Sequence, residues 1–261
     1  MDVLRELKSV RERVVVTMAA TNRNLFLSSL SPGSRALIDA HCTAVPLPIK
    51  TVLAQPEEIP PFAYFLTSGV ASVVSGMPEG NAVEVGMHGN DSVVSAIQVL
   101  GPSTSPMRCL MQIEGAGLRI PTEELRKIFF ASEEVRNRVL ALIQVDMLIL
   151  GQVAACNRLH GSEERLARWL LTAQDKVHMD VLNLTQEFLS EMLGARRATL
   201  TVVAGSLQRN GLIEYHRGRV KIADREGLED VACDCYRIIR NLRTSHPIAM
   251  RAPFNGGSIA V

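Results

Sequence analysis

Residues 184–211 read LTQEFLSEMLGARRATLTVVAGSLQRNG, and they predict two short helices joined by a tight turn. Thr185 is a good N-cap for the first helix, and Gly194 ends it. Between them, apolar residues recur at the three- and four-residue spacing of one helical face: Phe188, Leu189, Met192 and Leu193. The second helix, which ends at Asn210-Gly211, carries its own apolar stripe: Leu200, Val203, Ala204 and Leu207.

The two helices are expected to share a small core in which Ser190 allows close approach. This core comprises Leu189, Leu193, Ala195, Leu200 and Val203. The pattern is that of a helix-turn-helix, with a purely structural helix hairpin as the alternative. The second helix keeps an exposed face of cations and short hydrogen-bonding groups, suited to phosphates and base edges: Arg196, Arg197, Thr199, Thr201 and Gln208.

Positive charge is concentrated around this motif. From Arg196 to Ile222 there are six Lys or Arg against the single acid Glu214, a net charge of +5, whereas the whole chain is +1 and the remainder therefore −4. A local excess of this kind suits a polyanion, because phosphate contacts release counterions and supply much of the affinity. Two short strands around Gly218 predict a wing whose tip carries Arg217 and Arg219. Spacing, caps, charge and wing together favour DNA binding.

Length and composition indicate a globular protein with room for two domains. The chain has 261 residues, of which 47% are hydrophobic and only 4% aromatic, so its cores must be aliphatic. The five cysteines are an odd number without framework spacing, which favours a reducing compartment. The apolar run Val14–Ala20 is short for a signal peptide, and acids lie in the region that would have to be basic. We therefore expect a cytoplasmic protein.

The N-terminal half is predicted to be a helical segment, residues 1–43, followed by a β-roll, residues 44–131. Buried candidates in the helical segment are Leu25, Phe26, Leu27, Leu30, Leu37 and Ile38. In the second region, short runs rich in Val, Ile, Leu and Thr alternate with Gly and Pro turns, one of them at Gly69. This alternation predicts an antiparallel sandwich or β-roll, after which a short helix begins at Thr122.

Residues 132–160 predict one long helix that begins at Ser132 and carries two apolar stripes. One stripe comprises Leu140, Ile143, Met147, Leu150 and Ala154. The other comprises Val139, Leu142, Ile149 and Val153. Such a helix must cover two surfaces, which we expect to be the β-roll and the same helix of a second subunit. A membrane span is the rival interpretation, but Gln144, Asp146 and Gln152 interrupt the apolar run.

Residues 161–230 are predicted to form the winged helix-turn-helix domain, entered through a hinge at Gly161-Ser162 and a helix over residues 163–174. Residues 231–261 are expected to hold the rest of a last helix, Leu228 to Leu242, and a tail that is disordered beyond residue 244. Cys233 and Cys235 would then lie on that helix, where a C-x-C spacing points two thiols to different faces. A metal or redox role for this pair is therefore the less favoured interpretation.

This α+β arrangement of β-roll, long helix and winged helix-turn-helix resembles the Crp/Fnr superfamily of bacterial transcription regulators over roughly residues 20–230. The similarity is most specific in residues 161–171, GSEERLARWLL, which match the family's hinge and helix signature, and in residues 184–212. Residues 64–71, YFLTSGVA, are similar to the element that starts the family's sensory domain. Asn90-Asp91 matches its Gly-Asp turn.

Departures from the family pattern bear on the ligand. Members that bind cyclic nucleotides have a Gly-Glu pair for the ribose and an Arg-Ser for the phosphate, but this chain has no carboxylate between Asp91 and Glu114. Arg108 is either a displaced phosphate ligand or, as we expect, a solvated or ion-paired side chain. Apolar residues fill the place of the pocket's helix, so the site should be collapsed: Val93, Val94, Ala96, Ile97, Val99 and Leu100.

Other cofactors of the family also lack an evident site. Oxygen-sensing members hold iron and sulfur with N-terminal cysteines, whereas this chain has only Cys42 before residue 109. Haem stays open through His41, His88 or His160, although a lone histidine is more often an ordinary polar residue. We therefore expect no metal and no cofactor.

The resemblance implies a homodimeric, sequence-specific regulator that binds an inverted repeat in double-stranded DNA and contacts RNA polymerase, without cyclic nucleotide. The candidate DNA-binding residues are Thr185, Arg196, Arg197, Thr199, Thr201, Gln208, Arg217 and Arg219. Arg197 is expected to read a guanine edge, Arg196 and Thr199 to bind phosphates, and the wing arginines to bind flanking backbone. The alternatives are a small-molecule or redox sensor with an unidentified effector and a helix-turn-helix reused as an interaction surface. No catalytic motif favours an enzyme.

Overall fold

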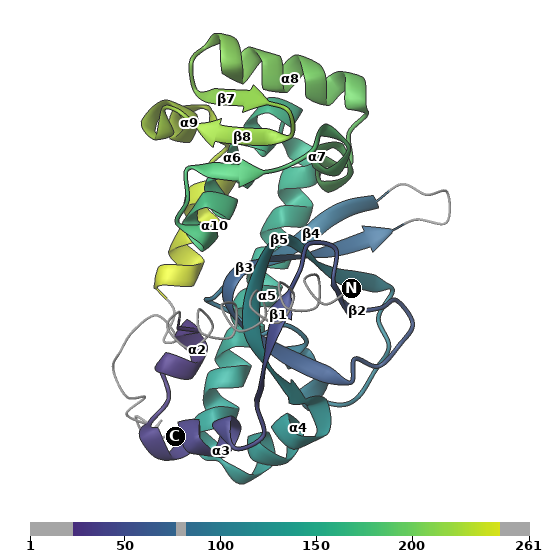
Figure 1. The fold of residues 1–261 in the computed structure, drawn as a ribbon, viewed down its shortest axis with the longest axis vertical. Helices are drawn as coiled ribbons and strands as arrows, with labels where there is room; N and C mark the ends of the chain where they lie inside the picture. The colour runs from purple at the N-terminus through teal and green to yellow at the C-terminus, as the bar shows by residue number, and fades with distance from the viewer. Residues whose placement is uncertain (1–22, 77–81, 246–261) are drawn as a thin grey trace, which may run out of the picture.

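The computed structural model describes residues 23–76 and 82–245, and it has the expected α+β architecture. A β-roll forms one end of the molecule, and helix α5 (Glu133–Leu159) runs along it toward a smaller helix-and-sheet module at the other end (Figure 1). The expected disorder beyond residue 244 falls almost entirely outside the described residues.

The β-roll is an antiparallel sheet in the order β1-β5-β3-β4, with β2 also paired to β5. The strands are β1 (Thr43–Leu47), β2 (Val52–Ala54), β3 (Phe62–Gly76), β4 (Ala82–His88) and β5 (Met107–Pro121). The turn predicted at Gly69 is wrong, because Gly69 lies inside β3 at a φ of +78° where the register with β5 shifts. A Cβ at Gly69 would stand 2.6 Å from the Ile113 carbonyl oxygen, so the close approach of the two paired strands at this register shift requires glycine.

Short helices close the end of the β-roll. These are α2 (Leu25–Ser28), α3 (Pro32–Asp39), the 3-10 helix η1 (Ala96–Val99) and α4 (Thr122–Ala131). The prediction of buried residues is confirmed for Phe26, Leu27, Leu30 and Ile38, and Phe26 stacks on Phe65 at 6.0 Å between ring centroids. It is wrong for Leu25 and Leu37, which are 46% and 49% exposed because they lie on the outer side of one-turn and two-turn helices.

Helix α5 begins as predicted, with the Ser132 hydroxyl accepting a hydrogen bond from the Val135 amide at 3.3 Å. The stripe of Val139, Leu142, Ile149 and Val153 is buried, but it meets two surfaces. Its first two residues pack into the β-roll core, whereas Ile149 and Val153 pack against Ile239 of the C-terminal helix. The other stripe is largely exposed, with Met147 65% exposed, but its member Ile143 is half-buried against the β-roll core. By length and composition α5 is apolar enough to cross a membrane, a test that core helices of soluble proteins also pass.

The C-terminal module consists of α6 (Ser162–Val177), a three-stranded sheet and four further helices. The strands are β6 (Val181–Asn183), β7 (Ile213–His216) and β8 (Arg219–Ile222), in the order β6-β8-β7. The helices are α7 (Gln186–Leu193), α8 (Arg197–Arg209), α9 (Arg225–Val231) and α10 (Cys235–Thr244). The single last helix predicted from Leu228 to Leu242 is wrong, because α9 ends at Val231 and Ala232 is extended.

Buried charges join this module to the β-roll. Lys176 of α6 is almost completely buried, and its Nζ lies 2.9 Å from both carboxylate oxygens of Asp91. Arg243 of α10 lies 3.7 Å from Asp91 and 2.8 Å from Asp146 of α5. Removing one member of such a buried pair leaves an uncompensated charge, so the network favours one relative placement of the two parts.

Glu84 of β4 forms a second buried link. Its Oε1 accepts a hydrogen bond from the Trp169 indole at 2.9 Å, and its other oxygen accepts one from the Ser72 hydroxyl. Burial raises the pKa of Glu84 from 4.5 to about 7, although both hydrogen bonds and Arg168 act in the opposite direction. The charged form is therefore the costly one at neutral pH.

Glu84→Gln should flatten the dependence of stability on pH. Because the folded pKa is raised, the contribution of Glu84 to stability is fully present below pH 4.5 and is lost as pH rises through about 7. The variant should gain on the order of 2 kcal/mol over wild type between pH 5 and pH 8, measured by denaturant unfolding. Exposed Glu58→Gln is the matched control and should leave the wild-type slope unchanged. Equal pH slopes for Glu84→Gln and wild type would contradict this role.

Candidate nucleic-acid interface

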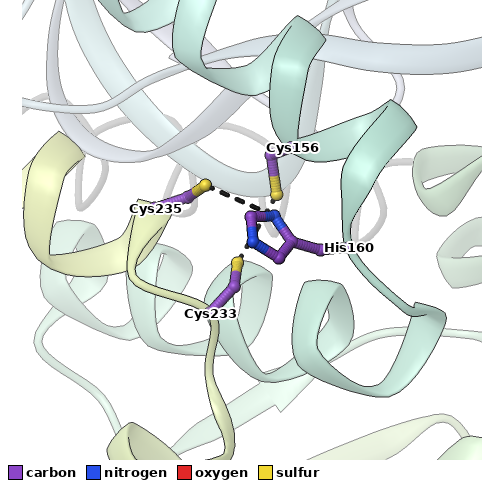
Figure 2. Close-up of side chains that lie close together, drawn as sticks. All are labelled: Cys156, His160, Cys233 and Cys235. Atoms are coloured by element: carbon purple, nitrogen blue, oxygen red, sulfur yellow. Dashed lines mark hydrogen bonds between the residues drawn. The ribbon is translucent and has the colours of Figure 1, made fainter.

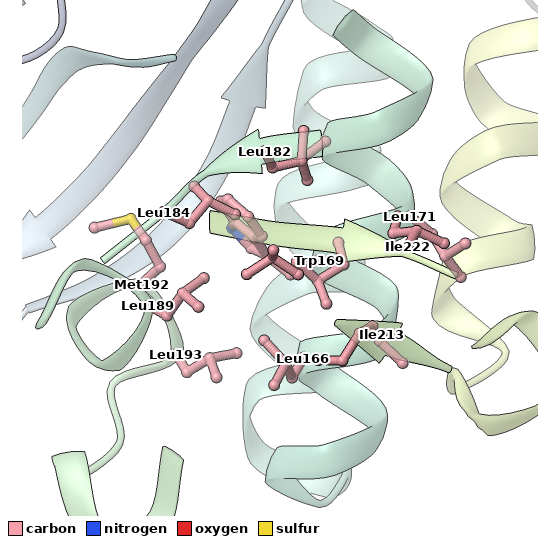
Figure 3. Close-up of a cluster of buried hydrophobic side chains, with 14 of the residues drawn as sticks. Leu166, Trp169, Leu171, Leu182, Leu184, Leu189, Met192, Leu193, Ile213 and Ile222 are labelled. Carbon is pink, nitrogen blue, oxygen red and sulfur yellow. The ribbon is translucent and has the colours of Figure 1, made fainter. Parts of the chain in front are cut away.

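Helix α6 is the base on which the C-terminal module is built. Leu166, Trp169 and Leu171 are no more than 1% exposed, and strands and helices surround them (Figure 3). The Trp169 ring meets the Phe188 ring of α7 edge to face, 5.9 Å between centroids. The helix-turn-helix is thereby fixed on a rigid support, which precise positioning on a duplex requires.

The predicted helix-turn-helix is confirmed in α7 and α8. The Thr185 hydroxyl caps α7 by accepting a hydrogen bond from the Phe188 amide at 3.2 Å. Gly194 ends α7 in the left-handed conformation, and the Ala195 amide donates back to the Ser190 carbonyl at 2.9 Å. The predicted core is also present: Leu189, Leu193 and Leu200 are buried, with Ala195 and Val203 packed against the same cluster.

Helix α8 lies at the outer end of the molecule, away from the β-roll (Figure 1). All five residues predicted for its exposed face are exposed: Arg196, Arg197, Thr199, Thr201 and Gln208. Arg196 is the N-cap, and the first turn contains no acid. The positive end of the helix dipole therefore coincides with two arginines, an arrangement that attracts phosphate.

Several of these side chains have partners within the module. Arg197 forms an ion pair with Glu187, an exposed residue in the first turn of α7 that sequence reasoning did not single out. Thr201 donates to the Arg197 carbonyl at 3.0 Å. Gln208 accepts a hydrogen bond from the Tyr215 amide at 2.8 Å, which connects the end of α8 to the wing. The sequence shows that Glu187 is an acid near the start of α7. Its ion pair with Arg197, however, depends on how α7 and α8 pack against each other.

The wing is the hairpin of β7 and β8, in which His216 pairs with Arg219 across a two-residue turn. Arg217 and Gly218 in this turn have φ angles of +45° and +76°, as hairpin turns of this length require. Arg217 and Arg219 are exposed as predicted. The Leu184 amide donates to the Gly218 carbonyl at 2.8 Å, so the wing is held beside the start of α7.

The part of the β-roll that corresponds to the cyclic-nucleotide pocket of Crp/Fnr family members differs from the prediction. Val93, Val94, Ala96 and Val99 are buried as predicted, whereas Ile97 and Leu100 are exposed. The expected collapse is wrong, because a cavity of about 290 Å³ lies between β4, η1, β5 and α5. Its lining is mainly apolar, and Arg108 forms an ion pair of 3.9 Å with Glu191 of α7.

The histidines considered as haem ligands are separated. His41 lies 3.8 Å from Glu124, and His88 is hydrogen-bonded to Ser92 at 3.1 Å, with burial lowering its pKa. His160 instead lies beside three cysteines, and these four residues are the group among the described residues that could hold a metal ion. Sequence reasoning missed this group because its two halves are distant in the chain, with Cys156 and Cys233 77 residues apart.

The comparisons agree with this geometry. Residues 164–231 match the family model of the Crp-like helix-turn-helix domain. No curated protein sequence matches the chain. A protein of Eubacterium rectale assigned to the Crp/Fnr family of transcriptional regulators has a similar structure, with a TM-score of 0.64 and 18% identity over 78% of this chain and 95% of its own.

Two further solved structures share the fold. FixK2 from Bradyrhizobium japonicum has a TM-score of 0.62 and 14% identity, covering 74% of this chain and 98% of its own. The c-di-GMP responsive global regulator CLP from Xanthomonas campestris has a TM-score of 0.62 and 16% identity, covering 74% of this chain and 100% of its own. The predicted resemblance to the Crp/Fnr superfamily is thereby confirmed.

Proposed function

We propose that this Crp/Fnr-type transcription regulator binds an inverted-repeat operator as a homodimer and does so without a cyclic nucleotide. The observation that carries the proposal is the exposed cationic face of α8, placed beside an arginine-bearing wing in one rigid module. Regulation of transcription from such an operator further implies contact with RNA polymerase. The protein acts by binding and not by catalysis.

The exposed stripe of α5 supports the homodimer. Its members follow the alternating spacing of three and four residues that defines a coiled-coil seam: Leu140, Ile143, Met147, Leu150 and Ala154. Leu140, Met147 and Leu150 are 43%, 65% and 38% exposed in the single chain. Pairing of two α5 helices along this seam would bury these side chains and place the two α8 helices symmetrically.

The exposed groups of α8 and the wing suit distinct roles on DNA. Arg197, at the first position of α8, can reach base edges in the major groove, where an arginine binds the O6 and N7 atoms of guanine. Its ion pair with Glu187 is exposed, so it exchanges readily for a guanine contact. Arg196 and Thr199 would bind phosphates, while Arg217 and Arg219 extend the contact to the flanking backbone. Ala198 accepts no hydrogen bond through its side chain, so the site should lack a cytosine contact there.

The cavity between β4, η1, β5 and α5 supports independence from cyclic nucleotides. A cyclic nucleotide needs a cation for its phosphate and an acceptor for its ribose hydroxyl, because each buried polar group must be satisfied. Asp146, the carboxylate lining the cavity, is bound to Arg243 and is therefore not free to accept from a ribose hydroxyl. The remaining lining is largely Val, Ala, Ile, Leu and Met, which suits an apolar effector better than a nucleotide.

Arg197→Ala should cost about 1 to 3 kcal/mol of DNA-binding free energy and flatten the preference at one base pair, because a base contact is lost. Arg217→Ala should weaken all sequences alike, since a phosphate contact carries no sequence information. Selection of bound sequences from random DNA, followed by titration of wild type and variants, measures both. Arg237→Ala, an exposed charge on α10, is the control and should change neither property. Equal, sequence-independent losses for Arg197→Ala and Arg217→Ala would refute the assignment.

Ile143→Glu with Leu150→Glu should convert the dimer to monomers, because four carboxylates would meet along the seam. Operator binding should fall with dimerisation, and half-sites in the selected DNA should lie about 34 to 36 Å apart. Sedimentation analysis with Leu148→Glu, an exposed position on α5 outside the seam, provides the control. A double variant that stays dimeric and binds DNA normally would exclude α5 as the interface.

Calorimetry with cyclic AMP and cyclic GMP should give no heat of binding at micromolar nucleotide, and nucleotide-free protein should bind its operator fully. A regulator without a nucleotide site has no such ligand to shift its conformational equilibrium. Micromolar binding together with nucleotide-dependent DNA affinity would show that the cavity accepts these ligands.

A further inference from the structure

Four side chains from two distant segments converge where α5 ends. Cys156 lies in the last turn of α5 and His160 is its C-cap, while Cys233 lies between α9 and α10 and Cys235 begins α10 (Figure 2). Their ligand atoms all lie within 4.8 Å of one another. The Sγ atoms of Cys156 and Cys233 are 3.5 Å apart, and Cys235 Sγ is 3.6 Å from His160 Nδ1.

The expectation that Cys233 and Cys235 point to different faces of one helix is wrong. Cys233 precedes α10 and Cys235 is its first residue, so the two cysteines do not lie on one helix, and both thiols reach toward the end of α5. On the other side, His160 is the C-cap of α5, and its amide donates a hydrogen bond to the Cys156 carbonyl at 3.1 Å, which holds the two residues one turn apart. Each segment thus contributes two ligands to one point.

The separations fit four ligands around a single ion. With Zn–S near 2.3 Å and Zn–N near 2.0 Å, the edges of a tetrahedron are about 3.8 Å between sulfurs and about 3.5 Å between sulfur and nitrogen. The two measured contacts lie close to these edges. The ligands of an iron–sulfur cluster bind different iron atoms and stand further apart, so this group is too compact for one.

The surroundings suit a buried anionic metal centre. Three thiolates and a divalent ion carry a net charge of −1, and the three cysteines are at most 6% exposed. The arginines of α6 act electrostatically on this cluster: Arg168 on Cys156, and Arg165 on Cys156 and Cys233. The Nε atoms of both arginines are buried without a hydrogen-bond partner among the described residues, so a nearby negative charge would help to compensate these two cations.

We propose that Cys156, His160, Cys233 and Cys235 form a structural Zn²⁺ site that fastens the C-terminal turn to the end of α5. Three cysteines and one histidine are a common ligand set of closed structural zinc sites. Because no ligand position is left open, the ion would stabilise the fold and not act on a substrate. The site rests on geometry alone; only its effect on DNA binding rests on the proposed function.

The test is zinc content and affinity of the full-length protein, purified under reducing conditions with Zn²⁺ present. Wild type should retain one zinc per chain after desalting, as should Cys42→Ser, whose thiol lies outside the cluster. Cys235→Ser and His160→Ala should each lower the affinity by at least about tenfold, since even outer-shell changes cost 10–100-fold. Replacement by Co²⁺ should give a thiolate-to-cobalt charge-transfer band that the two variants weaken. His160→Ala removes a partly exposed ligand, so the test stands even if Cys235→Ser fails to fold.

Other results would overturn the site. These are zinc below one-tenth equivalent in wild type, equal affinity in wild type and both ligand variants, bound iron with sulfide, or a disulfide between cluster cysteines in protein kept under reductant. A DNA-binding assay on the same samples separates the two proposals. Metal-free protein that binds DNA normally leaves the regulator intact, whereas zinc-loaded protein that binds no DNA contradicts the regulator and not the zinc site.

Discussion

Burial of α6 on most of its sides is the constraint on which the arrangement of the two parts depends. A helix buried in this way is normally apolar all round, yet α6 carries Arg165, Arg168 and Lys176 into the interior. Each cation therefore needs a compensating group: Lys176 has Asp91 of the β-roll, and Arg165 has the Leu193 carbonyl at the end of α7. The helix-turn-helix and the β-roll are consequently bound to opposite ends of the same helix, and neither can shift without leaving a buried charge unpaired.

Local signals made the DNA-binding module predictable from sequence. The Thr185 cap, the Gly194 stop and the two apolar stripes each act within a few residues, and the structure reproduces all of them. Predictions failed where a distant contact decides the conformation. Gly69 reads as a turn residue, but the pairing of β3 with β5 makes it part of a strand. Similarly, the apolar spacing from Leu228 to Leu242 suggests one helix, whereas the chain must turn at Ala232 to bring α10 onto α5.

That α5 covers more than one surface was predictable from the sequence, but the identity of every surface was not. Two stripes require two surfaces, and sequence alone offered only the β-roll and a second subunit. The structure adds a third, because α10 covers Val145, Ile149 and Val153 with Ile239. Since α10 comes from the C-terminal module, α5 contacts both parts of its own chain while Met147 and Leu150 stay exposed. A change in these exposed side chains would therefore act on a helix that contacts the C-terminal module directly, through α10.

The position of α10 shows how that coupling would work. Near its start, Cys235 lies beside His160 at the end of α5, and near its end Arg243 binds Asp146, which lies nearly four turns before His160, about 21 Å along the axis at 1.5 Å per residue. The two helices therefore run antiparallel and are fastened at both ends, with apolar contacts of Ile239 between. A fastening at one end alone would leave α10 free to pivot on Ile239. With both in place, α9 and the wing module that precedes α10 must follow any rotation of α5, so the four-ligand cluster and the Arg243 ion pairs would together transmit the geometry of the seam to α8.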